Sequence, residues 1–204
     1  MDATLAQELL LIAIDDAGRT RGGSTELDCG IAGAALSELS LAGRIGVVDG
    51  RVRVTDSAPT GDPESDAALA RIAGETKARK PDWWVDKLRH GQRNRLLARL
   101  VEGGVLRMER QDVLWLFSLR RYFAIDPRVT SVTRLRLEHV VVRGGHPDAR
   151  TAALVALLHA CGLTRRAFPE LDGKQLKTRM GELGDGQWVG AAVRKAIDSL
   201  QSSG

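Results

Sequence analysis

The chain has 204 residues, a formal net charge of +4 and a sequence pI near 9.4. With 43% hydrophobic and 27% charged residues, it has the composition of an ordinary globular protein with one sizeable core. No apolar run reaches the roughly 18 residues that a membrane span needs, so we expect no membrane-spanning helix. The modest positive charge is compatible with an anionic partner and identifies none.

The N-terminus and the cysteines indicate a cytoplasmic protein. Asp2 and Glu8 flank a short apolar stretch without a basic region before it, so we expect no signal peptide. Cys29 and Cys161 lie in apolar surroundings, which predicts two buried, reduced thiols rather than a disulfide or a metal site.

The first half of the chain predicts two helices followed by a hairpin. Residues 4–15 form an amphipathic pattern, and a polar loop follows. Residues 30–45 are apolar almost all round, which predicts a buried helix, and small residues along its first turns predict close neighbours. Residues 44–55 alternate around Asp49-Gly50, a strong hairpin signal. Glu38 is the sole acid in the buried segment, so we expect an arginine partner, either Arg44 or another.

The remaining pattern is also mostly helical. We expect a helix over 65–78, capped by Ser65 or Asp66, and then two helical pieces broken near Gly91. A second hairpin is predicted over 105–117 with its turn at 109–112, followed by a basic loop over 120–126. Helices are predicted over 130–142, 148–161, 169–180 and 189–200. The predicted architecture is therefore mainly α, a single-domain helical core over residues 1–204 with small projecting β-hairpins.

Several segments, in order, resemble the Golgi phosphoprotein 3 family and in particular its shorter bacterial members. They are Gln7-Glu-Leu-Leu-Leu11, the stretch from Gly30 to Ile45, Ala58-Pro-Thr-Gly-Asp62, Leu100-Val-Glu-Gly-Gly-Val-Leu106 and Ala152-Ala-Leu-Val-Ala-Leu-Leu-His-Ala160. The resemblance spans nearly the whole chain. It implies a peripheral membrane protein on the cytoplasmic face of a membrane, which binds anionic phospholipid and acts as an adaptor for protein cargo.

A basic cluster is the first candidate site. Lys87, Arg99 and the four residues Arg89, His90, Arg93 and Arg95 follow one another at helical spacings, and arginine forks suit phosphate oxygens. A solvated basic helix face is the alternative. The resemblance implies a phosphatidylinositol 4-phosphate site in which Arg93 matches one family arginine and Arg89 or His90 matches another. The family's third arginine is Ala32 here, and its tryptophan has no counterpart.

The second candidate is the apolar run Val113, Leu114, Trp115, Leu116 and Phe117 in the second predicted hairpin. A hairpin that is apolar on both faces needs a partner chain, the domain core or a membrane to cover it. The resemblance implies that this hairpin dips into the bilayer and contributes to self-association. Arg107, Arg110, Arg120 and Arg121 flank the run, as expected beside anionic lipid.

No catalytic, cofactor or metal motif is present in the sequence, so we expect a protein that is not an enzyme. The adjacent pair Asp15-Asp16 is explained by a helix end. A winged-helix nucleic-acid-binding module is the alternative function, because helix followed by hairpin is its outline. The apolar helix before the first hairpin cannot read DNA, which disfavours that alternative. A purely structural interaction domain is the third possibility.

Overall fold

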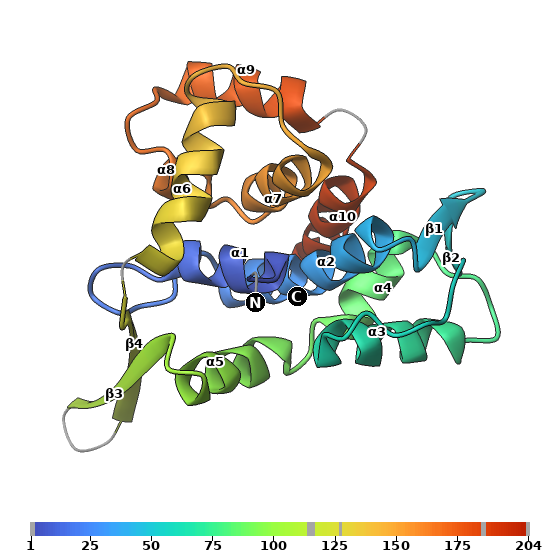
Figure 1. The fold of residues 1–204 in the computed structure, drawn as a ribbon, viewed down its shortest axis with the longest axis horizontal. Helices are drawn as coiled ribbons and strands as arrows, with labels where there is room; N and C mark the ends of the chain where they lie inside the picture. The colour runs from blue at the N-terminus through green and yellow to red at the C-terminus, as the bar shows by residue number, and fades with distance from the viewer. Residues whose placement is uncertain (1–2, 114–116, 127, 185–186, 203–204) are drawn as a thin grey trace.

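The computed structural model describes residues 3–113, 117–126, 128–184 and 187–202, and Figure 1 shows a body of helices with a hairpin at either end. Within these ranges lie ten helices and two two-stranded antiparallel sheets, so the expected mainly α fold with small hairpins is confirmed. The helices are α1 (Leu5–Ala13), α2 (Ser24–Leu41), α3 (Pro63–Ala73), α4 (Pro81–Leu88), α5 (Gln92–Glu102), α6 (Arg128–Val141), α7 (Ala149–Ala160), α8 (Thr164–Ala167), α9 (Gly173–Gly184) and α10 (Trp188–Ser202). The strands are β1 (Ile45–Val48), β2 (Arg51–Val54), β3 (Leu106–Val113) and β4 (Phe117–Ala124).

The central element is α2, as the sequence predicts, although it begins at Ser24 rather than near Gly30. It contacts α1, α3, α4, α5, α7 and α10, and Figure 1 shows it crossing the middle of the molecule. Its small residues permit this crowding. A Cβ on Gly33 would lie 2.4 Å from Val193 of α10 and 2.9 Å from Leu157 of α7. No helix within the described ranges has the combination of length and apolar character that a membrane crossing requires.

An arginine does pair with Glu38, but it is Arg150 of α7 rather than Arg44. The Nη1 atom of Arg150 lies 3.0 Å from Oε1 of Glu38, and the same carboxylate accepts the backbone N–H of Leu5 at 2.6 Å. Arg44 follows the end of α2 and instead pairs with Asp56. Because Arg150 also contacts Glu8, this network joins α1, α2 and α7 through their polar groups.

Helix starts follow the capping residues. Asp62 caps α3 by accepting the N–H of Ser65 at 2.9 Å, and Pro63 occupies the first helical position. The helix therefore starts earlier than residue 65, and Ser65 and Asp66 are not its cap. The helices over 128–141 and 149–160 confirm the sequence expectation. By contrast, α8 was not predicted, and α9 starts at Gly173 rather than at residue 169.

The first hairpin, β1–β2, forms within the predicted segment 44–55 and turns at Asp49-Gly50 as predicted. Val47 pairs with Val52 and Val48 with Arg51, and the turn residues Asp49 and Gly50 have φ values of 51° and 68°. Positive φ at both turn residues is the geometry that favours the right-handed twist of a two-residue hairpin. Val52 is buried, and its N–H donates to the carbonyl of Arg79 at 2.8 Å, so the hairpin is fixed to the chain before α4.

The second hairpin, β3–β4, is longer than predicted and turns elsewhere. Each strand has eight residues, and Val113 pairs with Phe117 at the far end. The predicted turn at 109–112 is wrong because these residues belong to β3, and the predicted loop over 120–126 is wrong because β4 continues to Ala124. Residues 114–116, the centre of the apolar run, lie outside the described residues.

Both cysteines are buried and unpaired. Burial raises the pKa of Cys29 to about 11 and that of Cys161 to about 12, which makes both thiols poor nucleophiles at neutral pH. Asp15 is also explained structurally. It accepts the side chains of Arg19 and Arg21 at 2.9 and 2.7 Å and fixes the loop between α1 and α2.

Candidate anion-binding site and membrane hairpin

The basic cluster is divided by a break in the helix. α4 ends at Leu88, and α5 begins at Gln92 after Gly91, whose φ of 75° turns the chain. Arg89 and His90 therefore precede the turn, whereas Arg93 lies in the first turn of α5. The break brings these three residues to one corner of the molecule, opposite the start of α2.

Asp28 of α2 lies in the middle of this corner. Its Oδ1 atom is 3.1 Å from Nε of Arg93, and its environment includes the charges of Arg89 and His90. Arg89 makes its own ion pair with Asp86, at 2.8 Å from Nε to Oδ1. In the part of the chain that the structure describes, both arginines form these pairs through Nε. A guanidinium has four further N–H donors on its two Nη atoms, so both side chains can still meet a phosphate oxygen.

The ionisation of Asp28 is set by two opposing influences. Partial burial raises the pKa of Asp28 above its ordinary value, while the positive charges of Arg93, Arg89 and His90 oppose the rise. The carboxylate of Asp28 thus lies among the cations of this corner, and a proton on Asp28 would remove its negative charge from the corner.

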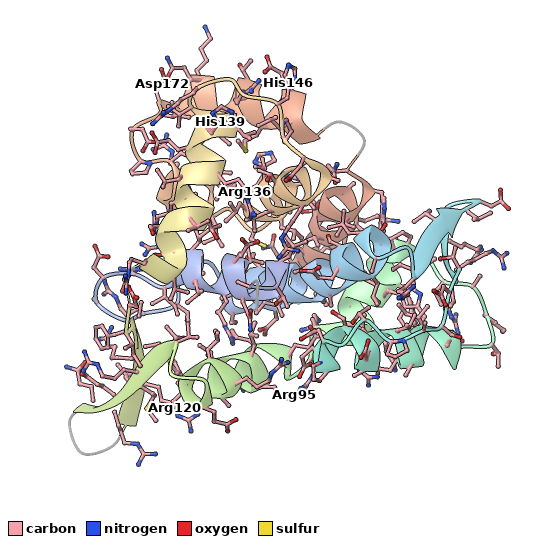
Figure 2. The ribbon with its side chains drawn as sticks, in the orientation of Figure 1. Arg95, Arg120, Arg136, His139, His146 and Asp172 are labelled. Atoms are coloured by element: carbon pink, nitrogen blue, oxygen red, sulfur yellow. The ribbon has the colours of Figure 1, made fainter. Side chains whose placement is uncertain are left out.

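Arg95 is not part of this corner. Its guanidinium forms a two-point ion pair with Glu64 of α3, with Nε–Oε1 at 3.1 Å and Nη2–Oε2 at 3.0 Å. Arg99 also points to α3, where it pairs with Asp62 at 3.2 Å. Figure 2 shows Arg95 beside α3 and α5 on the lower edge of the molecule. Of the four predicted site residues, Arg89, His90 and Arg93 are brought together, and Arg95 instead links α5 to α3.

The β3–β4 hairpin carries a second group of cations. Arg110 lies directly opposite Arg120 in the antiparallel register, and both are exposed. Like charges at directly opposed positions are destabilising in a sheet, so this pair does not help the hairpin to form. It lies three residue pairs from Val113 and Phe117, which is about 10 Å along a strand. Figure 2 labels Arg120 between the hairpin and the adjacent end of α5.

The base of this hairpin, in contrast, is fixed to the loop after α1. Tyr122 donates its backbone N–H to the carbonyl of Gly18 at 2.8 Å, and Leu106 is buried. Gly18 has a φ of +72°, and a Cβ there would lie 2.8 Å from the ring of Phe123. The hairpin thus has an anchored base and an exposed outer half.

The family model for Golgi phosphoprotein 3 matches residues 5–200, which is nearly the entire chain. This chain belongs to the Golgi phosphoprotein 3 family. The match covers both the corner around Asp28 and the β3–β4 hairpin, as the resemblance of the sequence implied. Among the residues that the structure describes, no group of three or more His, Cys, Asp or Glu side chains could hold a metal ion.

Sequence reasoning missed Asp28 as part of the site. No spacing links it to Arg93, which is 65 positions later in the chain, and only the packing of α5 on α2 brings the two together. The partners of Arg95 and Arg99 were missed for the same reason, since both carboxylates belong to the start of α3.

Proposed function

We propose that this Golgi phosphoprotein 3 family protein is a peripheral membrane protein that binds anionic phospholipid on the cytoplasmic face of a membrane. The observation that carries the proposal is the β3–β4 hairpin, which is anchored at its base and projects from the helical body. Its far end falls in the apolar run 113–117, and its outer half carries opposed arginines. In this proposal the apolar run would reach the acyl boundary of the bilayer, and the arginines, about 10 Å behind it, would lie at the depth of the lipid phosphates.

The corner of Arg89, His90 and Arg93 is the proposed head-group site. Two arginines and a histidine that converge on one carboxylate can accept a phosphorylated head group of the phosphatidylinositol 4-phosphate kind when that carboxylate is displaced or protonated. Each contact with the membrane is weak by itself. An apolar insertion combined with electrostatic attraction gives stable attachment, as in other two-signal anchors.

Nucleic acid fits the described arginines less well. α5 precedes a hairpin as a recognition helix would, but Arg95 and Arg99 on it are ion-paired with Glu64 and Asp62. α2 precedes the other hairpin and is buried. A protein cargo for the membrane-bound form is part of the proposal.

Vesicle co-sedimentation tests the proposal. The protein should sediment with phosphatidylcholine vesicles that contain phosphatidylglycerol or phosphatidylinositol 4-phosphate, and far less with phosphatidylcholine alone. The double variant Leu114→Asp/Trp115→Asp should lose this binding. Val47→Asp/Val48→Asp, on exposed positions of the other hairpin, is the matched control and should bind normally. Equal sedimentation of all three proteins, or none with any vesicle, would refute the proposal, and preferential retention of duplex DNA in a mobility-shift assay would favour the alternative.

Asp28→Asn tests the head-group site. Removing the competing charge should strengthen binding to anionic vesicles about two- to fivefold, which corresponds to the ~0.5–1 kcal/mol of a partly exposed ion pair. Because the pKa of Asp28 is raised, its carboxylate takes up a proton at higher pH than usual, so wild-type binding should increase as the pH falls. Asp28→Asn should lose that part of the pH dependence. A variant that binds no better and keeps the full pH dependence would place the site elsewhere.

A further inference from the structure

A groove lies between β2 and the loop that joins α3 to α4, and none of its lining residues belongs to the proposed head-group site or to β3–β4. Its volume is about 330 Å³. The floor is apolar, because Val52, Ile72 and Trp84 line it and each of them is 5% exposed or less. Figure 1 shows β1–β2 at the end of the molecule away from β3–β4, so a ligand in the groove would not obstruct the membrane hairpin.

Hydrogen bonds hold the walls of this groove in place. Val52 donates its backbone N–H to the carbonyl of Arg79 at 2.8 Å, and Nη1 of Arg51 donates to the carbonyl of Ala78 at 2.7 Å. Both bonds fix the segment before α4 beside β2. Arg79 also forms an ion pair with Glu75, at 3.2 Å from Nη2 to Oε1. The groove is therefore formed in the free protein, so a ligand has little of the chain to order when it binds.

One buried donor in the floor has no acceptor. Trp84 is 2% exposed, and its Nε1–H forms no hydrogen bond among the described residues. An indole N–H can only donate, so a cation or another donor cannot satisfy it. Leaving a buried donor unpaired is unfavourable, so a ligand that brings an oxygen acceptor to Trp84 gains free energy.

The rim of the groove carries an excess of positive charge. Arg53 and Lys77 are exposed lining residues, and in the described part of the chain neither side chain takes part in an ion pair. The carboxylate in the lining is that of Glu75, and Arg79 already pairs with it. A ligand therefore meets two uncompensated cations, which favours an anion.

The apolar floor favours a carboxylate over a phosphate. A phosphate monoester carries roughly −1.5 to −2 charges at neutral pH. Part of that charge would be buried against apolar side chains beside Glu75, which is unfavourable. A carboxylate carries a single charge, and its two oxygens can accept one N–H from the floor and one from the rim. An apolar group attached to the carboxylate would cover the floor and exclude water from it.

We propose that this groove binds an apolar carboxylate, meaning a carboxylate attached to an aliphatic or aromatic group. One carboxylate oxygen accepts the Nε1–H of Trp84, and Lys77 and Arg53 pair with the negative charge. The apolar group packs on Val52 and Ile72. The same chemistry is present in a free organic acid and in a glutamate that lies between apolar residues of a partner protein. The site does not depend on the proposed membrane contact, so either can fail without the other.

Matched pairs of ligands test the inference by NMR on the ¹⁵N-labelled protein. Phenylpropanoate and its neutral amide differ in charge, and so do the capped peptides Val-Glu-Val and Val-Gln-Val. The indole N–H resonance of Trp84 is identified as the one that Trp84→Phe removes. It should shift with the charged member of a pair and not with the neutral member, at a dissociation constant of about 1 mM for ligands of this size. A shift with phenylpropanoate assigns a free organic acid, and a shift with the glutamate peptide alone assigns a partner protein. Equal shifts within each pair, or no shift with any ligand up to about 10 mM, would overturn the inference.

Variants test whether the residues of the groove carry the binding. Lys77→Glu should weaken binding of the charged ligand about tenfold with an unchanged melting temperature, because Lys77 is exposed and its charge is reversed. Arg71→Glu, the same change of charge at an exposed position outside the groove, is the matched control and should bind normally. Trp84→Phe, followed through the backbone amide of Lys77, should also weaken binding about tenfold, since it removes the donor and keeps a ring. Full binding by Lys77→Glu or by Trp84→Phe, or an equal loss in Arg71→Glu, would contradict the proposed site.

Discussion

The two hairpins project at opposite ends of the fold and differ in how they are held. β1–β2 has four residues per strand, and Val52 in its middle is buried and bonded to Arg79. β3–β4 has eight residues per strand, and among the described residues it is fixed toward its base, where Leu106 is buried and Tyr122 bonds to Gly18. The residues from Arg107 to Gln111 are all exposed.

This difference distinguishes a structural hairpin from one that is available for binding. An isolated two-stranded hairpin is marginally stable in water, so the outer half of β3–β4 gains little from folding by itself. Its arginines also oppose each other across the strands, at a cost to stability. The exposed length and the opposed like charges of β3–β4 are features that the proposed membrane contact would explain.

The largest expected effect is at the base of β3–β4. Leu106→Ala should lower the free energy of unfolding by about 2–5 kcal/mol. Leu106 is 1% exposed, so truncating its side chain leaves a cavity between α5 and the hairpin. Val52→Ala, the matched change in β1–β2, should cost about 1–2 kcal/mol at ~0.8 kcal/mol for each methyl or methylene group removed. Urea unfolding of both variants measures the difference. Equal or reversed losses would show that the longer hairpin is not anchored at Leu106.

Two glycine substitutions should separate tertiary anchoring from turn geometry. Gly18→Ala should cost about 2–4 kcal/mol, since it combines a positive φ with a Cβ placed 2.8 Å from the Phe123 ring. Gly50→Ala meets nothing within 4 Å and should cost only the ~1–2 kcal/mol of its positive φ. Hydrogen exchange adds a local readout. The Tyr122 amide should lose protection in Gly18→Ala alone, and unchanged protection would contradict the anchor.

The smallest expected effect has opposite signs for stability and for binding. Arg110→Glu replaces a like-charge pair with an opposite-charge pair across from Arg120, which should stabilise the hairpin by about 0.2–1 kcal/mol. The same change should weaken binding to anionic vesicles, because it removes a cation from the membrane side. Thermal unfolding and co-sedimentation of the one variant give both results. If stability and vesicle binding rise together, Arg110 does not face lipid.

The sequence predicted those features that short segments determine. Asp49-Gly50 sets the turn and register of β1–β2 through two residues with positive φ. The helix break at Gly91 depends on a single glycine with a positive φ, and the burial of α2 follows from its own apolar residues. Both features can therefore also be predicted from a short segment. The turn of the second hairpin was predicted wrongly at 109–112, because these residues carry no two-residue turn signal of the Asp-Gly kind and belong to β3.

Contacts between distant segments could not be predicted in this way. Glu38 needed an arginine on physical grounds, but the choice of Arg150 depends on how α7 packs against α2. Likewise, the resemblance pointed to Arg93, while the carboxylate of Asp28 beside it became visible only in the folded chain. The sequence thus named Arg89, His90 and Arg93, and the carboxylate that lies among them was found only in the structure.

The central claim is that the far end of β3–β4 enters an anionic bilayer, and the fluorescence of Trp115 tests it most directly. In this experiment the other three tryptophans, Trp83, Trp84 and Trp188, are replaced by Phe. Replacing Trp84 loses no hydrogen bond, because the Nε1 of Trp84 has no acceptor among the described residues. A tryptophan that moves from water to the membrane interface emits further to the blue. The account predicts a blue shift and protection from an aqueous quencher when phosphatidylglycerol vesicles are added, and no change with phosphatidylcholine alone. Emission from Trp115 that is already blue and protected in the free monomer, and unchanged by vesicles, would contradict the claim.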